Sequence, residues 1–382
     1  MEQWLVSVQC QPSQKDSITQ VIEQEVMQTS SRPLGRVHLF NCPIHFKVGS
    51  LDQLVALADD LNKLDHHLEG VVKKVERQFV EIEPNPHLTI DNPFVGNQQS
   101  FAPIDYVANF QWNNSKYPPT KTLQELSGLI EERMRALDDD VKNKTVRYQE
   151  AKNSLGAITK KESGNLYSKD LAEIITSAIA SPEDFINSEH LKTYLIVLPK
   201  KDVKKWLEGY EFLDSGVVPR STKQFDVEDK DLTLWRVVVL KPSADSFVSA
   251  VKQNKWAARE FSFDPAYTEN QAASKEKVNK QFQTQHNLLW RACKVVFSEL
   301  FIALIHLKAM RIFAESVLRY SLPPQFVSFY IIPERDREKR VLDSMVKKFM
   351  RPGETADMYG SRDDSDENED FFPFVFVRLP SF

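Results

Sequence analysis

The chain has 382 residues, with 49 Lys and Arg against 54 Asp and Glu, 41% hydrophobic residues and 3 Cys. The net charge of −5, with both signs interspersed, leaves no basic face for nucleic acid. Glycine is scarce: 11 residues are about 3% of the chain, where roughly 7% is usual. This scarcity favours long uninterrupted helices and argues against the glycine-rich loops that cradle phosphates.

The sequence predicts no membrane segment and no signal peptide. The longest apolar run, residues 301–307, is far shorter than the ~20 residues that cross a bilayer. The first residues lack the basic start and apolar core of a secretory signal. We therefore expect a cytosolic chain with reduced thiols.

The two ends of the chain both have the composition of β-strands. Residues 4–8 and 371–379 are rich in β-branched and aromatic side chains. We expect these two segments to pair in one sheet, which would make the terminal domain discontinuous in sequence.

Long helices are predicted between the two ends. Capping boxes at Ser50 and at Thr122 mark two helix starts. The first helix should end before Pro84 and Pro86, and the second should run to Gly156 with a narrow apolar stripe. The stripe comprises Leu123, Leu126, Ile130, Met134, Leu137, Val141, Tyr148 and Leu155.

The partner expected for that stripe lies between Pro265 and Pro323, where neither Gly nor Pro occurs. A helix of this length would reach about 85 Å, more than the ~55 Å diameter of a compact ball of this chain. We therefore predict an elongated molecule with a long antiparallel two-helix neck.

The stretch between the two long helices differs in kind, because it alternates helices with strands. Helices are expected at 171–180, 201–213 and 243–254, and strands at 193–198, 232–240 and 257–263. The predicted fold class is α+β and predominantly helical. We expect a foot domain of residues 1–120 and 300–382, a helical neck of residues 121–156 and 266–299, and a small α/β head domain of residues 157–265.

Motifs that carry chemistry are absent from the sequence. Neither phosphate-binding pattern, Gly-x-x-x-x-Gly-Lys or Gly-x-Gly-x-x-Gly, occurs, and His-Glu-x-x-His and Gly-x-Ser-x-Gly are missing as well. His38, Cys42 and His45 supply three donors that suit zinc, but we favour a partly buried loop there, and we interpret His66 and His67 as solvated surface. We therefore predict no catalytic residue, no cofactor and no metal.

A dense acidic cluster precedes the last strand-like segment. It lacks the Gly at position six and the Glu at position twelve of a calcium-binding EF-hand loop, so we expect a solvated loop. Its members are Asp363, Asp364, Asp366, Glu367, Glu369 and Asp370, all within residues 363–370.

Five separated blocks of sequence resemble the C subunit of the eukaryotic vacuolar-type proton ATPase (V-ATPase). They appear in family order at residues 47–52 with 69–75, 110–112 with 116–118, 217–221, 258–261, and 313–320 with 322–323. The resemblance implies a foot, a helical neck and a head, with no nucleotide site. It also implies a non-catalytic stator, a regulatory component that clamps peripheral stalks to the membrane sector and takes part in reversible assembly.

The resemblance also implies the partners. The head would bind a stalk heterodimer of the E and G subunits, and the foot a second such stalk and the cytosolic N-terminal domain of the membrane-embedded a subunit. The chain would then be cytoplasmic and associated with vacuolar, endosomal or lysosomal membranes only through the complex. An alternative class is a cytoskeletal, actin-binding or vesicle-tethering coiled-coil protein.

Three head residues are candidates for partner binding: Val218, Pro219 and Arg220. An exposed Pro-Arg turn between strands is a plausible docking point, and its competing interpretation is a purely structural turn. Arg311, Arg319 and Tyr320 are expected to brace the foot internally and not to touch a partner.

Overall fold

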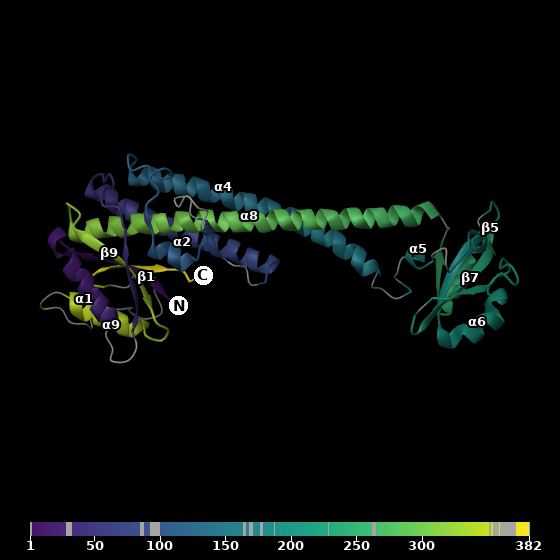
Figure 1. The fold of residues 1–382 in the computed structure, drawn as a ribbon. Coiled ribbons are helices and arrows are strands. Elements are labelled where there is room, and N and C mark those ends of the chain that lie inside the picture. The colour runs from purple at the N-terminus through teal and green to yellow at the C-terminus, as the bar shows by residue number, and fades with distance from the viewer. Residues whose placement is uncertain are drawn as a thin grey trace. The chain divides into compact units, whose positions relative to one another are not determined.

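A computed structural model describes residues 2–27, 33–84, 88–91, 100–162, 166–167, 171–175, 179–186, 188–227, 229–261, 265–350, 353, 359 and 372–381. The chain forms two compact units (Figure 1). Unit 1 comprises Met1–Thr145 and Asn287–Phe382, and unit 2 comprises Val146–His286. The acidic cluster at 363–370 lies outside the described residues. The expected foot, neck and head boundaries and the elongated shape stay predictions.

Helices predominate, as expected for the predicted α+β class. The α-helices are α1 Lys15–Met27, α2 Leu51–Ile82, α3 Pro103–Ala108, α4 Leu123–Glu162, α5 Leu171–Ile174, α6 Val203–Gly209, α7 Ala244–Gln253, α8 Pro265–Tyr320 and α9 Glu338–Phe349. Short 3-10 helices are η1 Pro12–Gln14, η2 Pro182–Asp184, η3 Lys200–Asp202, η4 Tyr210–Phe212 and η5 Lys241–Ser243. The strands are β1 Gln3–Gln9, β2 Gly35–Phe40, β3 Ile90–Asp91, β4 Ser100–Phe101, β5 Leu191–Pro199, β6 Lys223–Phe225, β7 Leu232–Leu240, β8 Ala257–Glu260, β9 Phe326–Pro333 and β10 Val375–Leu379.

The central sheet of unit 1 joins the two ends of the chain. Its strand order is β10-β1-β9-β2, and β1 pairs antiparallel with β10, so that Gln3 lies opposite Leu379. The predicted pairing of the termini is confirmed. Strands β1 and β2 are parallel with β9 between them, and β9 and β10 are parallel with β1 between them. Helices α1 and α9 make the two crossovers, which gives the ferredoxin-like arrangement.

The two faces of this sheet are covered by different helices (Figure 1). One face packs with α1 and α9 around a core that includes Trp4, Phe329 and Met345. Helix α8 covers the opposite face, where the Ser316 hydroxyl donates to Ser7 Oγ at 2.7 Å. Because alternate side chains of a strand point to opposite faces, β1 contributes side chains to the core under α1 and α9 and to the face that α8 covers.

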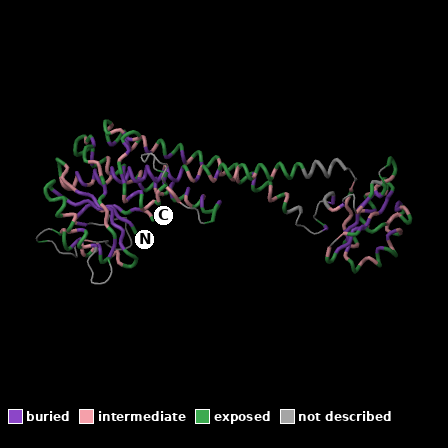
Figure 2. The backbone as a smooth tube through the Cα atoms, viewed as in Figure 1, coloured by how far each residue is buried: buried purple, intermediate pink, exposed green. Residues whose placement is uncertain are grey.

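Helix α8 changes character along its length (Figure 2). Residues 300–310, inside unit 1, are all buried, whereas residues 273–277, inside unit 2, are all exposed. A helix that is buried all round must be covered by other elements on every side. The buried stretch of α8 is therefore the helical centre of unit 1.

The bracing role expected for the end of α8 is confirmed. The Tyr320 hydroxyl donates to the Ser7 carbonyl at 2.8 Å, and Arg319 donates to the Phe374 carbonyl. Arg311 forms ion pairs with Asp65 and Glu315. These contacts fix α8 to α2, to strand β1 and to the segment that enters β10.

Both predicted capping boxes are present. Gln53 N–H donates to Ser50 Oγ at 3.3 Å and Ser50 N–H to Gln53 Oε1 at 3.1 Å. Thr122 N–H likewise donates to the Glu125 carboxylate at 2.7 Å, and Glu125 N–H to Thr122 Oγ1 at 3.3 Å. The expected uninterrupted helix after Pro265 is confirmed as α8, which has 56 residues.

The predicted helix end at Gly156 is wrong, because α4 continues to Glu162. A Cβ at Gly156 would meet nothing within 4 Å, so neither a turn nor a close approach requires glycine there. Glycine inside a helix costs roughly 1 kcal/mol relative to alanine but does not end the helix. The first six residues of the predicted stripe, up to Val141, are buried, whereas Tyr148 and Leu155 are half-buried.

Unit 2 repeats the strand topology of unit 1. Its sheet is β6-β7-β5-β8, with all neighbouring strands antiparallel. The parallel strands β7 and β8 are separated by β5 and joined by α7. Helices α6 and α7 pack on one face, through Trp206 and Phe247 among others, so the alternating helices and strands form an antiparallel βαββαβ layer.

The other face of this sheet is covered by the segment around α5. Leu166, Leu171, Ile175 and Ala180 pack on it with Phe225. The helix expected at 171–180 is shorter than predicted, because α5 ends at Ile174. Ile175 donates its N–H to the Leu171 carbonyl at 2.9 Å, and its side chain is fully buried.

A buried charge cluster links α2 to α8 inside unit 1. The Asp65 and Lys308 side chains are 0% and 2% exposed, and Lys308 Nζ lies 2.8 Å from Asp65 Oδ2. Lys308 also pairs with Glu69 and donates to the Arg378 carbonyl of β10 at 2.9 Å. Because a charge buried without partners costs far more than it does in water, these groups fix the relative positions of two helices and a strand.

His306 occupies a second buried polar site on α8. Its Nδ1 lies 2.7 Å from the Ile302 carbonyl and its Nε2 accepts from Asn113 N–H at 3.0 Å, which fixes a neutral tautomer. The rings of Phe110, Trp112 and Tyr117 surround it, with centroids 4.7 to 5.0 Å from its own. Burial lowers the pKa of His306 from 6.5 to about 3.

Replacing Lys308 by Met should lower the free energy of unfolding of unit 1 by about 1.5–3 kcal/mol, because Asp65 keeps its Arg311 partner but Asp65 and Glu69 both lose the Lys308 ammonium group. Lys74→Met is the matched control, since its ion pair with Asp138 lies at the surface and should be worth less than about 1 kcal/mol. Urea unfolding measures both. Equal effects of the two substitutions would contradict the importance of the buried cluster.

Acid should destabilise unit 1 through His306. Between about pH 6.5 and pH 3 the unfolded chain binds a proton that the folded chain excludes, so stability falls as pH decreases below 6.5. By pH 5 this contribution amounts to about 2 kcal/mol. Urea unfolding at pH 7.5 and pH 5 should show a smaller difference for His306→Gln, whereas the exposed control His67→Gln should keep it. An unchanged difference in His306→Gln would refute this assignment.

Candidate partner-binding surface

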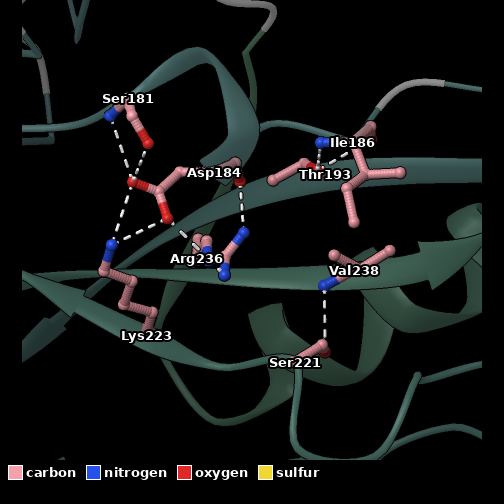
Figure 3. A network of polar contacts seen from close by, with 8 residues as sticks. All are labelled: Ser181, Asp184, Ile186, Thr193, Ser221, Lys223, Arg236 and Val238. Carbon is pink, nitrogen blue, oxygen red and sulfur yellow. Dashed lines mark hydrogen bonds and ion pairs between the residues drawn. The ribbon is translucent and has the colours of Figure 1, made fainter. Parts of the chain in front are cut away.

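The Val218–Arg220 turn is fixed to the edge of β7 by hydrogen bonds that join Val218 and Ser221 to Val238 and to each other. Val218 N–H donates to the Val238 carbonyl at 3.0 Å. Ser221 Oγ accepts from Val238 N–H at 3.2 Å (Figure 3). The same hydroxyl donates to the Val218 carbonyl at 2.6 Å. The turn therefore projects from a strand of the sheet as an ordered feature. Val218 is half-buried, whereas Pro219 and Arg220 are exposed.

Arg220 adopts a left-handed backbone conformation, with φ at 55°. For a residue with a Cβ this costs roughly 1–2 kcal/mol, so neighbouring groups must stabilise it. Its N–H donates to Glu211 Oε1 at 2.9 Å, and the Tyr210 hydroxyl donates to the same oxygen at 2.8 Å. The hydrogen bond from Arg220 is the main cause that holds the pKa of Glu211 below its usual value. The carboxylate thus couples the turn to η4.

Phe212 is the functional candidate that the sequence analysis missed. Its side chain is 87% exposed, in an element whose other aromatic residue, Tyr210, is buried. It follows directly after Glu211, which holds the turn, and Leu207 of α6 is also exposed, at 48%. Aromatic residues dominate the energetics of protein interfaces, so a solvated Phe beside an ordered Pro-Arg turn has the composition of a docking site. The predicted helix at 201–213 gave no signal for which of its aromatic residues would be outside.

An ion-paired clamp lies beside the turn on the same sheet (Figure 3). Asp184 Oδ1 is 2.7 Å from Lys223 Nζ and 3.6 Å from Arg236 Nη2. Its other oxygen accepts from Ser181 N–H at 3.1 Å. Burial disfavours the charge of Asp184, but the hydrogen bonds from Lys223 and Ser181 outweigh it and lower the pKa of this carboxyl. The clamp holds η2 against β6 and β7.

The candidate metal residues are not brought together. Contrary to the loop interpretation, His38 lies in strand β2, where main-chain pairing with β9 fixes it opposite Tyr330. Cys42 donates to the Ala309 carbonyl at 3.4 Å, and burial raises its pKa, while His45 is exposed. Across the described ranges no group of three or more His, Cys, Asp or Glu side chains could hold a metal ion. His66 and His67 are exposed on α2, as predicted.

Within the described parts of the chain, none of the helices combines the length and the apolar character that crossing a bilayer requires.

Comparison with known families shows to which protein family this chain belongs. The family model that describes the C subunit of the V-ATPase matches residues 3–375. The chain belongs to the V-ATPase C-subunit family. The match includes both units and the candidate turn.

Named relatives agree with the family model. The V-type proton ATPase C subunit of Caenorhabditis briggsae is 36% identical over 342 residues, which are 87% of this chain and 86% of the relative. The C 1 subunit of the V-type proton ATPase of Bos taurus is 32% identical over 387 residues, 99% of this chain and 97% of the relative. The Manduca sexta protein of the same name as the first is also 32% identical, over 390 residues, 99% of this chain and 97% of the relative. The resemblance seen in the sequence blocks is confirmed.

Replacing Asp184 by Asn should destabilise unit 2 by about 1–3 kcal/mol, because Lys223 and Arg236 lose their shared carboxylate. The pKa of Asp184 is lowered, so its contribution is present above pH ~4 and is lost as pH falls through the folded value. Glu183→Gln, an exposed neighbour, is the control and should change stability by less than about 0.5 kcal/mol. Chemical unfolding at pH 7 tests this, and identical stabilities of the two variants would contradict the clamp.

Proposed function

We propose that this chain is a non-catalytic stator subunit of a V-type proton ATPase. In this role it clamps peripheral stalks to the membrane sector, so that ATP hydrolysis is coupled to proton transport, and it takes part in reversible assembly of the two sectors. The family match over residues 3–375 is the observation that carries the proposal. The chain would work in the cytoplasm, attached to vacuolar, endosomal or lysosomal membranes through the complex alone.

The proposal assigns a stalk to each unit and a further partner to unit 1. Unit 2 would dock a stalk heterodimer of the E and G subunits through Phe212 and the Val218–Arg220 turn. Unit 1 would contact a second such stalk and the N-terminal domain of the a subunit. Two interfaces of moderate strength on one chain bind tightly together through effective concentration, yet each can be released separately. Such separability suits a component that must leave when the complex disassembles.

Stiffness would come from α4 and α8 acting together as a strut. Arg133 of α4 lies 3.6 Å from Glu299 of α8, and the tilted rings of Tyr148 and Phe282 have centroids 5.7 Å apart. The 56 residues of α8 correspond to about 84 Å of helix axis. A helical pair of this kind would convey bending and torsion without a catalytic pocket.

A binding measurement tests the role of the head surface. Phe212→Ala should weaken binding of purified E–G heterodimer by about 30-fold, the usual cost of truncating an aromatic hot spot. Since Phe212 is 87% exposed, the substitution should leave folding unchanged. The control is Ile186→Ala, which truncates an apolar side chain that is 42% exposed on another part of unit 2. Equal affinities of the two variants would remove Phe212 from the proposed interface.

Co-purification tests the proposal at the level of the complex. Recovery of ATPase catalytic subunits with the tagged chain, lost when the stalk heterodimer is removed, is the expected result. Actin co-sedimentation with no ATPase component recovered would contradict the proposal and favour the cytoskeletal alternative.

A further inference from the structure

Five lysines gather on one side of α6 and at the end of α7. Lys201 of η3 and Lys204 and Lys205 of α6 are exposed, whereas Trp206 and Tyr210, which follow them, are buried against the sheet. All five are exposed, and they come from η3, α6, α7 and the turn after α7. We call them the lysine face: Lys201, Lys204, Lys205, Lys252 and Lys255.

Direct contacts join the two parts of the lysine face. Lys205 Nζ donates to Asn254 Oδ1 at 2.9 Å and lies 5.4 Å from the centre of the Trp256 ring. The Trp256 indole N–H in turn donates to Asp202 Oδ2 at 3.1 Å. Lys255 takes a left-handed conformation, with φ at 62°, at the turn that places it beside Trp256. These contacts bring Lys205 to the end of α7, where Lys252 and Lys255 lie, and the resulting basic face was not predicted from the interspersed charges of the sequence.

The lysine face is not neutralised within the part of the chain that the structure describes. None of its lysines takes part in an ion pair there, in contrast to Lys192 and Lys223 of the same unit. The η3–α6 segment also carries two carboxylates, the exposed Glu208 and Asp202, which accepts from the Trp256 indole N–H and keeps its charge. Five ammonium groups against these two carboxylates leave a net positive surface that favours an anionic partner.

Apolar groups lie next to the lysine face. Leu207, which is 48% exposed, follows Lys204 by three residues on α6 and therefore lies beside it, and Phe212 follows in η4 beside the Arg220 turn. A protein interface combines an apolar centre with a charged rim, and the partner proposed for unit 2 is a protein. A lipid surface also binds basic and apolar side chains together, so a vesicle probe separates the two. A partner that presents apolar and acidic residues side by side is an amphipathic helix with an acidic face.

We propose that the lysine face recognises the acidic face of an amphipathic helix, whose apolar stripe packs on Leu207 and Phe212. This inference rests on the proposed function, because the partner expected at unit 2 is the stalk heterodimer. It adds the chemistry of recognition: charge complementarity sets the association rate and the orientation, and the apolar flank supplies the anchor. Binding that depends on exposed lysines is weakened by salt, because mobile ions screen exposed charges.

The test measures binding of the full chain to purified E–G heterodimer at 50 mM and 300 mM salt. The lysine variant carries Lys201→Glu, Lys205→Glu, Lys252→Glu and Lys255→Glu. The control carries the same number of reversals on exposed positions of α9, namely Lys339→Glu, Arg340→Glu, Lys347→Glu and Lys348→Glu. All substituted side chains are exposed, so circular dichroism should show unchanged folding in both variants.

The expected result is a loss of at least 10-fold at 50 mM salt for the lysine variant, a change within about 3-fold for the control, and a wild-type affinity that falls as salt increases. If the wild type binds and the lysine variant binds equally well, this inference is overturned while the proposed function stands. If the wild type does not bind at any salt concentration, the proposed stalk contact fails and this inference fails with it.

Vesicles containing phosphatidylserine are the second probe. If they bind the wild type but not the lysine variant, while heterodimer affinity is unchanged, the face contacts membranes and the inference is wrong.

Discussion

Pairing of the two ends of the chain in one sheet is the constraint on which the rest of unit 1 depends. Strand β1 lies between β10 and β9, so the sheet cannot form until residues from opposite ends of the chain meet. Helix α8 is fixed to this sheet by Ser316, Arg319 and Tyr320, and α2 is fixed to α8 by the charges around Lys308. Because loss of β10 would leave Lys308 without the Arg378 carbonyl, the sheet and the helices stabilise one another.

The same βαββαβ plan is used in both units, and unit 2 is inserted into the connection between the second and third strands of the unit 1 sheet. In each sheet two crossover helices cover one face, and the second face is left for another element. In unit 1 that element is α8, whereas in unit 2 it is the segment around α5. The functional candidates lie at the margins of the second sheet, on the turn after Gly216 and on α6, where partner contacts do not disturb the core.

Local signals allowed much of the fold to be predicted. The capping boxes at Ser50 and Thr122, the absence of breakers before Tyr320 and the β-rich ends each depend on neighbouring residues alone. Other features could not be predicted from local signals. Gly156 continues a helix because no turn or close approach requires glycine there, and the strand order of unit 2 depends on β5 entering between β7 and β8. The turn at Val218–Arg220 could be found from its Pro-Arg sequence, but the exposure of Phe212 is decided by which aromatic side chains the sheet buries.

The central claim is that unit 2 contacts a stalk through a defined surface on α6, η4 and the adjacent turn. A cryo-EM map of the assembled proton ATPase that contains this chain tests it most directly. The account predicts stalk helix density against Phe212 and Arg220, with acidic side chains facing Lys201 and Lys205. A map in which this surface is solvated while the stalk contacts another part of unit 2, or does not reach it, would contradict the account.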